Sequence, residues 1–206
     1  MIKYIIFDFD GTLADSKDVF IAVYNQIAKK NNYRQMEPEN LQYLRTLTIG
    51  ERCRYLKVPL YRIPFLAVEF LNLYKKSLQN VRLFEGIGEV LNALRLKGME
   101  ASIISSNSKN NIENILKDNG VDSITKIYCS TSLFGKEKLI REFLKKYGVT
   151  KDQVLYVGDE LRDIIACKKA GVAVAWVEWG YDIRQSVIHA QPDYLLREPA
   201  DILSIL

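Results

Sequence analysis

Histidine is nearly absent from this sequence. His189 is the only one among 206 residues, and it stands in a late polar segment. A Ser-His-Asp triad and a histidine-rich zinc site are therefore hard to build, because both need histidine among their functional groups. We expect His189 to serve at the surface or in packing.

Two nucleotide-binding fingerprints are also missing. No Gly-x-Gly-x-x-Gly occurs, and Gly135-Lys136 has Ser130 where a P-loop needs its first glycine. These absences count against a nucleotide-binding α/β domain.

Cysteine is scarce as well. The three cysteines, Cys53, Cys129 and Cys167, are odd in number and far apart, so we expect neither a disulfide framework nor a metal-binding spacing. No apolar run approaches the roughly 20 residues of a membrane helix. The N-terminal run ends in acids, which is not typical of a signal peptide. We therefore expect reduced thiols, a cytoplasmic location and no membrane partner.

The charge balance is mild. The chain carries 29 Lys and Arg against 25 Asp and Glu, a formal net charge of +4 that is spread along the sequence. Such a balance can favour an anionic small molecule, but it is far from that of a nucleic-acid-binding tail. We expect no nucleic-acid partner and a monomer or weak homodimer.

Short apolar runs alternate with helical patterns along most of the chain. The expected strands are residues 2–7, 101–105, 127–130, 154–157 and 172–177, with a shorter candidate at 194–196. The expected helices are residues 86–96, 108–119, 136–147 and 161–170. This alternation predicts an α/β fold with a Rossmann-like parallel sheet and helices on both faces.

Residues 15–81 break the alternation. They contain helical patterns at 19–30 and 65–78, frequent tyrosines and no convincing strand. We therefore predict an α/β core domain of residues 1–14 and 82–206. A small helical domain, residues 15–81, is inserted after the first strand, and we call it the helical insertion. Hinges are expected near residues 13–16 and 80–83.

Asp8 and Asp10 follow the first expected strand. Side chains two positions apart share a face, so both carboxylates can address one site at the carboxyl edge of the sheet, where open α/β folds bind ligands. Gly11 allows close backbone approach to a ligand. A calcium loop is excluded because its glycine position holds Leu13. A plain acidic turn remains the alternative.

Ser105, Ser106 and Asn107 end the next strand. Hydroxyls and backbone N–H groups at a strand-to-helix turn suit phosphate oxygens. The alternative is helix capping, which serine and asparagine also favour, and Ser108 is expected to provide the cap.

Lys136 opens a later helix, and Asp159 and Asp163 follow the strand at 154–157. The lysine could neutralise a phosphate and orient a carboxylate, or it could be a solvated charge. Asp159 and Asp8 would suit Mg²⁺, which prefers oxygen ligands. Alternatively, these acids could simply interact with the dipole of the helix that they precede.

Taken in order, these residues resemble a known family. Asp8-Phe9-Asp10-Gly11-Thr12-Leu13, Ser105, Lys136 and Gly158-Asp159…Asp163 resemble the four signature motifs of the haloacid dehalogenase-like hydrolases, and most closely those of the phosphoglycolate-phosphatase-like branch. Leu83-Phe84-Glu85-Gly86 also resembles that branch. The resemblance covers residues 1–14 and 82–206, and the helical insertion resembles the family's helical cap.

The resemblance implies a Mg²⁺-dependent phosphatase that hydrolyses a small-molecule phosphomonoester, phosphoglycolate-like or a sugar phosphate, through an aspartyl-phosphate intermediate. It implies that Asp8 is the nucleophile, Asp10 the general acid/base and Lys136 the cation that steadies nucleophile and phosphate. The implied phosphate-binding residues are Gly11, Ser105, Ser106, Asn107 and Lys136, with Ser105 favoured over Ser106 as the hydroxyl. The implied metal ligands are Asp8, Asp10 through its backbone carbonyl, Asp159 and Asp163.

Several alternatives stay open. A sugar-phosphate mutase or a pyrophosphatase would use the same chemistry, and a non-catalytic phospho-ligand-binding protein would keep the same fold. Asp10 argues against dehalogenation, because dehalogenases of this family lack that second acid. Arg45, Arg52 and Arg54 in the helical insertion could meet an anionic end of the substrate or could be solvated.

Overall fold

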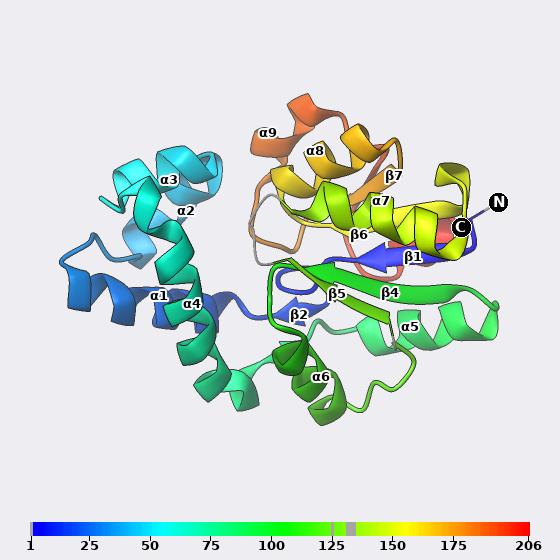
Figure 1. Ribbon diagram of the computed structural model, residues 1–206, viewed down its shortest axis with the longest axis horizontal. Coiled ribbons are helices and arrows are strands. Elements are labelled where there is room, and N and C mark those ends of the chain that lie inside the picture. Colours follow the sequence, from blue (N-terminus) through cyan, green and yellow to red (C-terminus); the bar gives the residue numbers. More distant parts are fainter. Residues whose placement is uncertain (1, 125, 131–134) are drawn as a thin grey trace.

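The fold is built on a six-stranded sheet. We describe it from a computed structural model that covers residues 2–124, 126–130 and 135–206 (Figure 1). The strand order is β5-β4-β1-β6-β7-β8, and every neighbouring pair is parallel. The strands are β1 (Tyr4–Phe7), β4 (Glu100–Ser105), β5 (Lys126–Cys129), β6 (Val154–Gly158), β7 (Ala173–Val177) and β8 (Tyr194–Leu196). The predicted parallel α/β sheet is confirmed.

Helices cover both faces of this sheet (Figure 1). They are α5 (Ile87–Leu96), α6 (Lys109–Asp118), α7 (Lys136–Tyr147), α8 (Leu161–Ala170), α9 (Arg184–Val187) and α10 (Asp201–Ser204). Because strand side chains alternate, Ile5 and Phe7 of β1 pack in the cluster that includes α5 and α6, whereas Ile6 packs with α7 and α8. All five residues of β6 are buried, as expected for a parallel strand covered on both faces.

The predicted core helices agree with the observed ones to within one residue at each end. Ser108 caps α6 as expected, since its hydroxyl accepts a hydrogen bond from Asn111 N at 3.3 Å. The apolar residues Ile112, Ile115 and Leu116 lie on the buried face of α6, which explains why this polar sequence forms an amphipathic helix.

The helical insertion contains α1 (Lys17–Asn31), α2 (Pro38–Thr46), α3 (Ile49–Tyr55) and α4 (Ile63–Tyr74). Helices α2 and α3 were not predicted. They are short, and local capping starts them: Pro38 occupies the first turn of α2, and Thr48 and Glu51 form a capping box on α3. Within the described chain, no helix has the length and apolar character that a membrane crossing requires.

A two-stranded ribbon connects the helical insertion to the sheet. Strands β2 (Ala14–Asp15) and β3 (Arg82–Leu83) pair antiparallel, and neither was predicted. The ribbon lies where hinges are expected, so the two crossings of the chain are held side by side. In Figure 1 the arrow of β1 points toward the side on which α1–α4 lie. The carboxyl end of β1 therefore faces the helical insertion.

Candidate active site

The predicted site residues lie at the carboxyl edge of the sheet. Asp8 follows β1, Ser105 ends β4, Asp159 follows β6, and Lys136 begins α7. Because β1 pairs with both β4 and β6, the ends of these three strands are neighbours. The topology thus brings together motifs that are about 150 residues apart in the chain.

Lys136 is the centre of this site. Its Nζ lies 2.6 Å from Asp8 Oδ2 and also donates a hydrogen bond to Asp163 Oδ1, and all three residues are buried. Burial alone works to lower the pKa of Lys136, but Asp163 and Asp8 outweigh it and hold the pKa above the ordinary lysine value. Lys136 is therefore a buried cation shared by two acids, and the alternative of a solvated lysine is excluded.

An acidic group surrounds this lysine. One carboxylate oxygen each from Asp8, Glu160 and Asp163 lies within 4.8 Å of the other two. Burial raises the pKa of Asp8, and it raises that of Asp163 to about 6, although Lys136 opposes both shifts. The sequence interpretation placed Asp8 and Asp163 together and missed Glu160. The only sequence signal for Glu160 is its position between two acids already selected.

Glu160 is paired with Arg162, whose Nε donates to Oε2 at 2.7 Å. Burial works to raise the pKa of Glu160, but Arg162 and then Lys136 outweigh it, so the pKa lies below its ordinary value. Glu160 is therefore ionised at neutral pH even though it is buried.

Asp159 is fully buried and held by two donors. Thr12 Oγ1 donates to its Oδ1 at 2.9 Å, and the backbone N–H of Tyr181 donates to its Oδ2 at 2.7 Å. Burial, followed by the charges of Glu160 and Asp8, raises the pKa of Asp159 well above its ordinary value. Its oxygens are not part of the close group of three, as far as the described residues extend.

Two glycines make room for Asp159. A Cβ at Gly180 would lie 2.1 Å from Asp159 Cβ, and one at Gly11 would lie 2.4 Å from Asp159 Oδ2. Gly11 also has φ of +80°, a conformation that favours glycine. The motif glycine after Asp10 is therefore required by close packing against the acid that follows β6.

The donor set fits a divalent cation. Four buried carboxylates gather here, on Asp8, Asp159, Glu160 and Asp163, and the described cations Lys136 and Arg162 face them. The charge of Arg52 also acts on Glu160, but Arg52 is paired with a fifth acid, Asp182. Ionised together, these groups leave two negative charges uncompensated, which is costly in a buried site. Oxygen ligands of this kind suit a hard divalent ion.

Asp10 has different partners. Its Oδ1 accepts a hydrogen bond from the Tyr74 hydroxyl at 2.7 Å, and its Oδ2 accepts one from Asn107 Nδ2 at 2.9 Å. Burial, together with the charge of Asp10, raises the pKa of Tyr74 far above its ordinary value, so Tyr74 stays a neutral donor. Tyr74 ends α4, so the helical insertion contacts Asp10 directly. Sequence interpretation missed Tyr74, for which the only signal was the abundance of tyrosine in residues 15–81.

The turn after β4 is organised by its own side chains. Ser105 is buried, and its hydroxyl oxygen accepts from Asn107 N at 3.1 Å, which leaves the hydroxyl proton for another acceptor. Ser106 lies further out, with Arg162 Nη1 at 3.4 Å from its oxygen. Both hydroxyls thus stay candidates for contact with phosphate.

An aromatic group of the helical insertion borders Asp10. Phe20 lies with its ring centroid 5.0 Å from that of Phe70 and 5.5 Å from that of Tyr181, and Phe70 stacks on Tyr74 at 5.8 Å. These contacts form a chain of rings that runs from Tyr74, which donates to Asp10, through Phe70 and Phe20 to Tyr181.

The arginines of the helical insertion have different environments. Arg45 and Arg52 contact residues 180–182, whereas Arg54 is exposed.

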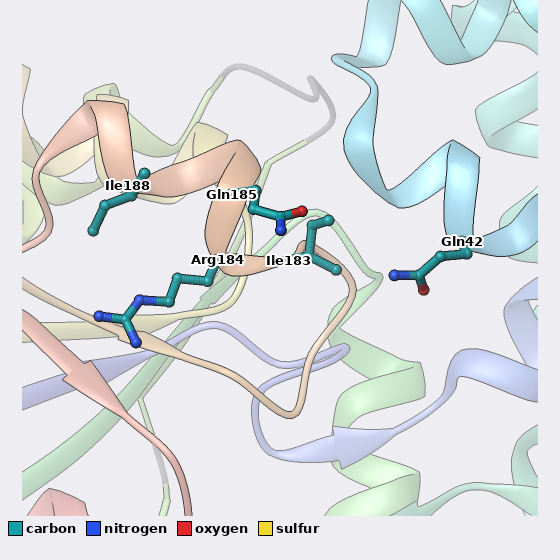
Figure 2. A pocket seen from close by; sticks show the side chains of 5 residues that line it. All are labelled: Gln42, Ile183, Arg184, Gln185 and Ile188. Carbon is teal, nitrogen blue, oxygen red and sulfur yellow. The ribbon is translucent and has the colours of Figure 1, made fainter.

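Beside this contact lies a cavity of about 420 Å³ lined by Gln42 of α2 and by four residues at α9. Figure 2 shows Gln42 facing Ile183 and Gln185 across it. None of the predicted site residues lines this cavity.

Comparison with known proteins agrees with this geometry. A family model described as haloacid dehalogenase-like hydrolase matches residues 5–177. A phosphoglycolate phosphatase from Synechococcus elongatus is 32% identical over 200 residues, which cover 97% of this chain and 94% of that protein. A phosphoglycolate phosphatase from Haemophilus influenzae is 26% identical, with 99% and 98% covered.

Solved structures show the same fold. A haloacid dehalogenase-like family hydrolase from Streptococcus pneumoniae superposes with a TM-score of 0.83 at 20% identity, covering 99% of this chain and 98% of that one. Together with the matching family model and the 32% identical relative, the four motifs identify the family. The chain belongs to the haloacid dehalogenase-like hydrolases, in the phosphatase branch that resembles the phosphoglycolate phosphatases.

Proposed function

We propose that this enzyme is a Mg²⁺-dependent phosphatase that hydrolyses a small phosphomonoester, phosphoglycolate-like or a sugar phosphate, through an aspartyl-phosphate intermediate on Asp8. The observation that carries the proposal is the buried contact of Lys136 with Asp8 and Asp163 at the carboxyl edge of the sheet. A cation fixed beside a carboxylate can neutralise an approaching phosphate, so that one anion can attack another.

The first step would join Asp8 to phosphorus. An oxygen of Asp8 attacks, the bond from phosphorus to the ester oxygen breaks, and Asp10 gives its proton to the leaving alcohol. In the second step Asp10 takes a proton from water, the water oxygen attacks phosphorus, and Asp8 leaves as a free carboxylate. Ser105 and Lys136 would hold the phosphate oxygens throughout.

The metal would be held by Asp8 and Asp163, with Glu160 or Asp159 beside them. When bound, Mg²⁺ supplies positive charge that stabilises the phosphoryl oxygens. The excess of buried carboxylates supports this assignment.

We also propose that residues 15–81 act as a cap over this site. The hydrogen bond from Tyr74 to Asp10 supports the assignment, because it joins the helical insertion to the general acid/base.

The three cysteines are free thiols, which supports a cytoplasmic setting.

The test is phosphate release from p-nitrophenyl phosphate with MgCl₂ or with EDTA, followed by 2-phosphoglycolate, sugar phosphates and pyrophosphate. We expect turnover only with Mg²⁺, and none from Asp8→Asn, which removes the nucleophile. Asp118→Asn, an exposed acid on α6, is the matched control and should behave as wild type. Metal-independent turnover, or full turnover by Asp8→Asn, would refute the mechanism. Preference for pyrophosphate would move the enzyme to the pyrophosphatase alternative.

A further inference from the structure

Residues 180–182 lie between the helical insertion and the acids that follow β6. Arg45 of α2 holds this segment by its backbone. Its Nε donates to the carbonyl oxygen of Tyr181 at 2.8 Å, and its Nη2 donates to that of Gly180 at 3.0 Å and reaches that of Asp182 at 3.4 Å. One guanidinium group therefore hydrogen-bonds to three successive carbonyl oxygens, because arginine presents several N–H donors in a fixed planar arrangement.

Asp182 adds a second connection. Its Oδ1 pairs with Arg52 of α3, with side-chain exposures of 6% for the acid and 21% for the arginine. Its Oδ2 accepts the backbone N–H of Leu161 at 2.7 Å, and Leu161 is the first residue of α8. A single buried carboxylate thus links the helical insertion to the start of the helix that carries Asp163.

Tyr181 makes the third connection. Its backbone N–H donates to Asp159 Oδ2 at 2.7 Å, and its hydroxyl lies 2.8 Å from that of Ser16, next to the β2–β3 ribbon. Gly180 packs so closely on Asp159 that an added Cβ would lie 2.1 Å from that residue's own. The position of Asp159 is therefore defined by this segment as much as by β6.

We propose that residues 180–182 are a positioning relay, through which closure of the helical insertion fixes Asp159 and the first turn of α8 in their working positions. Arg45 and Arg52 can hold the segment only when the helical insertion lies against the sheet domain. They then act on the acidic group through Tyr181 and Asp182 and do not touch the substrate. This inference rests on the proposed function for the role of the acids, but the contacts can be measured without turnover.

The test compares Arg45→Met and Arg52→Met with Arg54→Met, an exposed arginine on the same helix as Arg52. Two readouts need no turnover: hydrogen exchange of peptides that span residues 159–163, and Mn²⁺ affinity by titration calorimetry. Both relay variants should lose protection at the Leu161 amide and bind Mn²⁺ about 10-fold to 100-fold more weakly, the usual effect of losing support behind a metal ligand. Arg54→Met should match wild type in both.

Kinetics separate positioning from substrate binding. The relay variants should lose kcat by a similar factor on p-nitrophenyl phosphate and on 2-phosphoglycolate, which carries a further carboxylate. A loss confined to KM for 2-phosphoglycolate would overturn the proposal, because it would make the arginines substrate ligands. Unchanged exchange and Mn²⁺ affinity in both variants would overturn it as well.

A double-mutant comparison completes the design. Asp182→Asn keeps an oxygen for the Leu161 N–H but loses the charge that faces Arg52. If Arg52 acts through Asp182, the double variant Arg52→Met/Asp182→Asn should bind Mn²⁺ no more weakly than the worse of the two single variants. Additive losses would show that the two residues act separately and would refute the relay. Where circular dichroism shows that Arg52→Met does not fold, Arg52→Gln replaces it, because glutamine also removes the charge that pairs with Asp182, and it should show the same losses. A wild type that hydrolyses no phosphate ester would refute the proposed function, while exchange and Mn²⁺ binding would still decide the relay.

Discussion

Replacing Lys136 with methionine tests the central contact of the site. Methionine keeps most of the length and apolar volume of the stem but removes the charge that Asp8 and Asp163 share. Both acids are almost fully buried, and Lys136 Nζ lies 2.6 Å from Asp8. Breaking a buried ion pair by removing one partner costs about 3–5 kcal/mol. We therefore expect the free energy of unfolding to fall by that amount in EDTA at pH 8.

The same loss should appear on heating. A protein of this size loses roughly 2–4 °C of Tm per kcal/mol, so Lys136→Met should melt about 6–20 °C below wild type. Urea unfolding followed by circular dichroism gives the free energy, and scanning calorimetry gives Tm. Lys138→Met is the control, because Lys138 lies on the same helix with its side chain 82% exposed. It should stay within about 0.5 kcal/mol of wild type.

The loss in the free energy of unfolding of Lys136→Met, which we call the deficit, should depend on pH with a definite sign. Burial already raises the pKa of Asp163 to about 6, and loss of Lys136 removes the largest opposing effect. A carboxyl whose pKa is raised in the folded state favours folding while it is protonated, and that stability is lost as pH rises. The deficit of Lys136→Met should therefore grow from pH 5.5 to pH 8. A variant that is as stable as wild type at pH 8 would refute the buried ion pair.

Three further predictions concern other contacts. Tyr74→Phe removes the hydroxyl that donates to Asp10. This bond strengthens as Asp10 gives its proton to the leaving alcohol and becomes a carboxylate, and because hydrogen bonds to charged groups contribute about 1.5–3 kcal/mol, kcat on p-nitrophenyl phosphate should fall at least about 10-fold. Gly180→Ala should lower the melting temperature and weaken Mn²⁺ binding, because its Cβ would collide with Asp159. Cys129 should alkylate slowly with iodoacetamide at pH 8 and faster as pH rises, because burial raises its thiol pKa to about 11 and leaves roughly one thiolate in 1,000.

Each of these predictions has a matched control. Tyr61→Phe alters a tyrosine that is 75% exposed and should leave kcat unchanged. Gly88→Ala meets no atom within 4 Å and should stabilise α5 by up to about 1 kcal/mol. Unfolding in urea should bring the alkylation rate of Cys129 to that of an ordinary cysteine. Wild-type kcat in Tyr74→Phe, wild-type melting in Gly180→Ala or fast alkylation of folded Cys129 would contradict the corresponding contact.

The chemistry of the site follows largely from local sequence. Asp8 could be selected because it follows an apolar strand, Lys136 because it begins a helical pattern, and Asp163 because it lies in the first turn of the helix after β6. Parallel strands bring such positions to one edge of the sheet. The four expected core helices and most of the strands follow from the same periodicity. Glu160 was missed because the pattern does not reveal which of the nearby acids after β6 lie close to Asp8.

The sequence alone determined the class of sheet, the order of its motifs and the family, since these depend on periodicity and on residues a few positions apart. Only the tertiary structure decided how the helical insertion meets the site. Contacts of Tyr74 with Asp10, and of Arg45 and Arg52 with residues 180–182, join residues that are 64 to 137 positions apart in the chain. They depend on the packing of α1–α4 against the sheet domain through the β2–β3 ribbon. No local pattern encodes that orientation, because it results from many side chains that become neighbours only after the chain has folded.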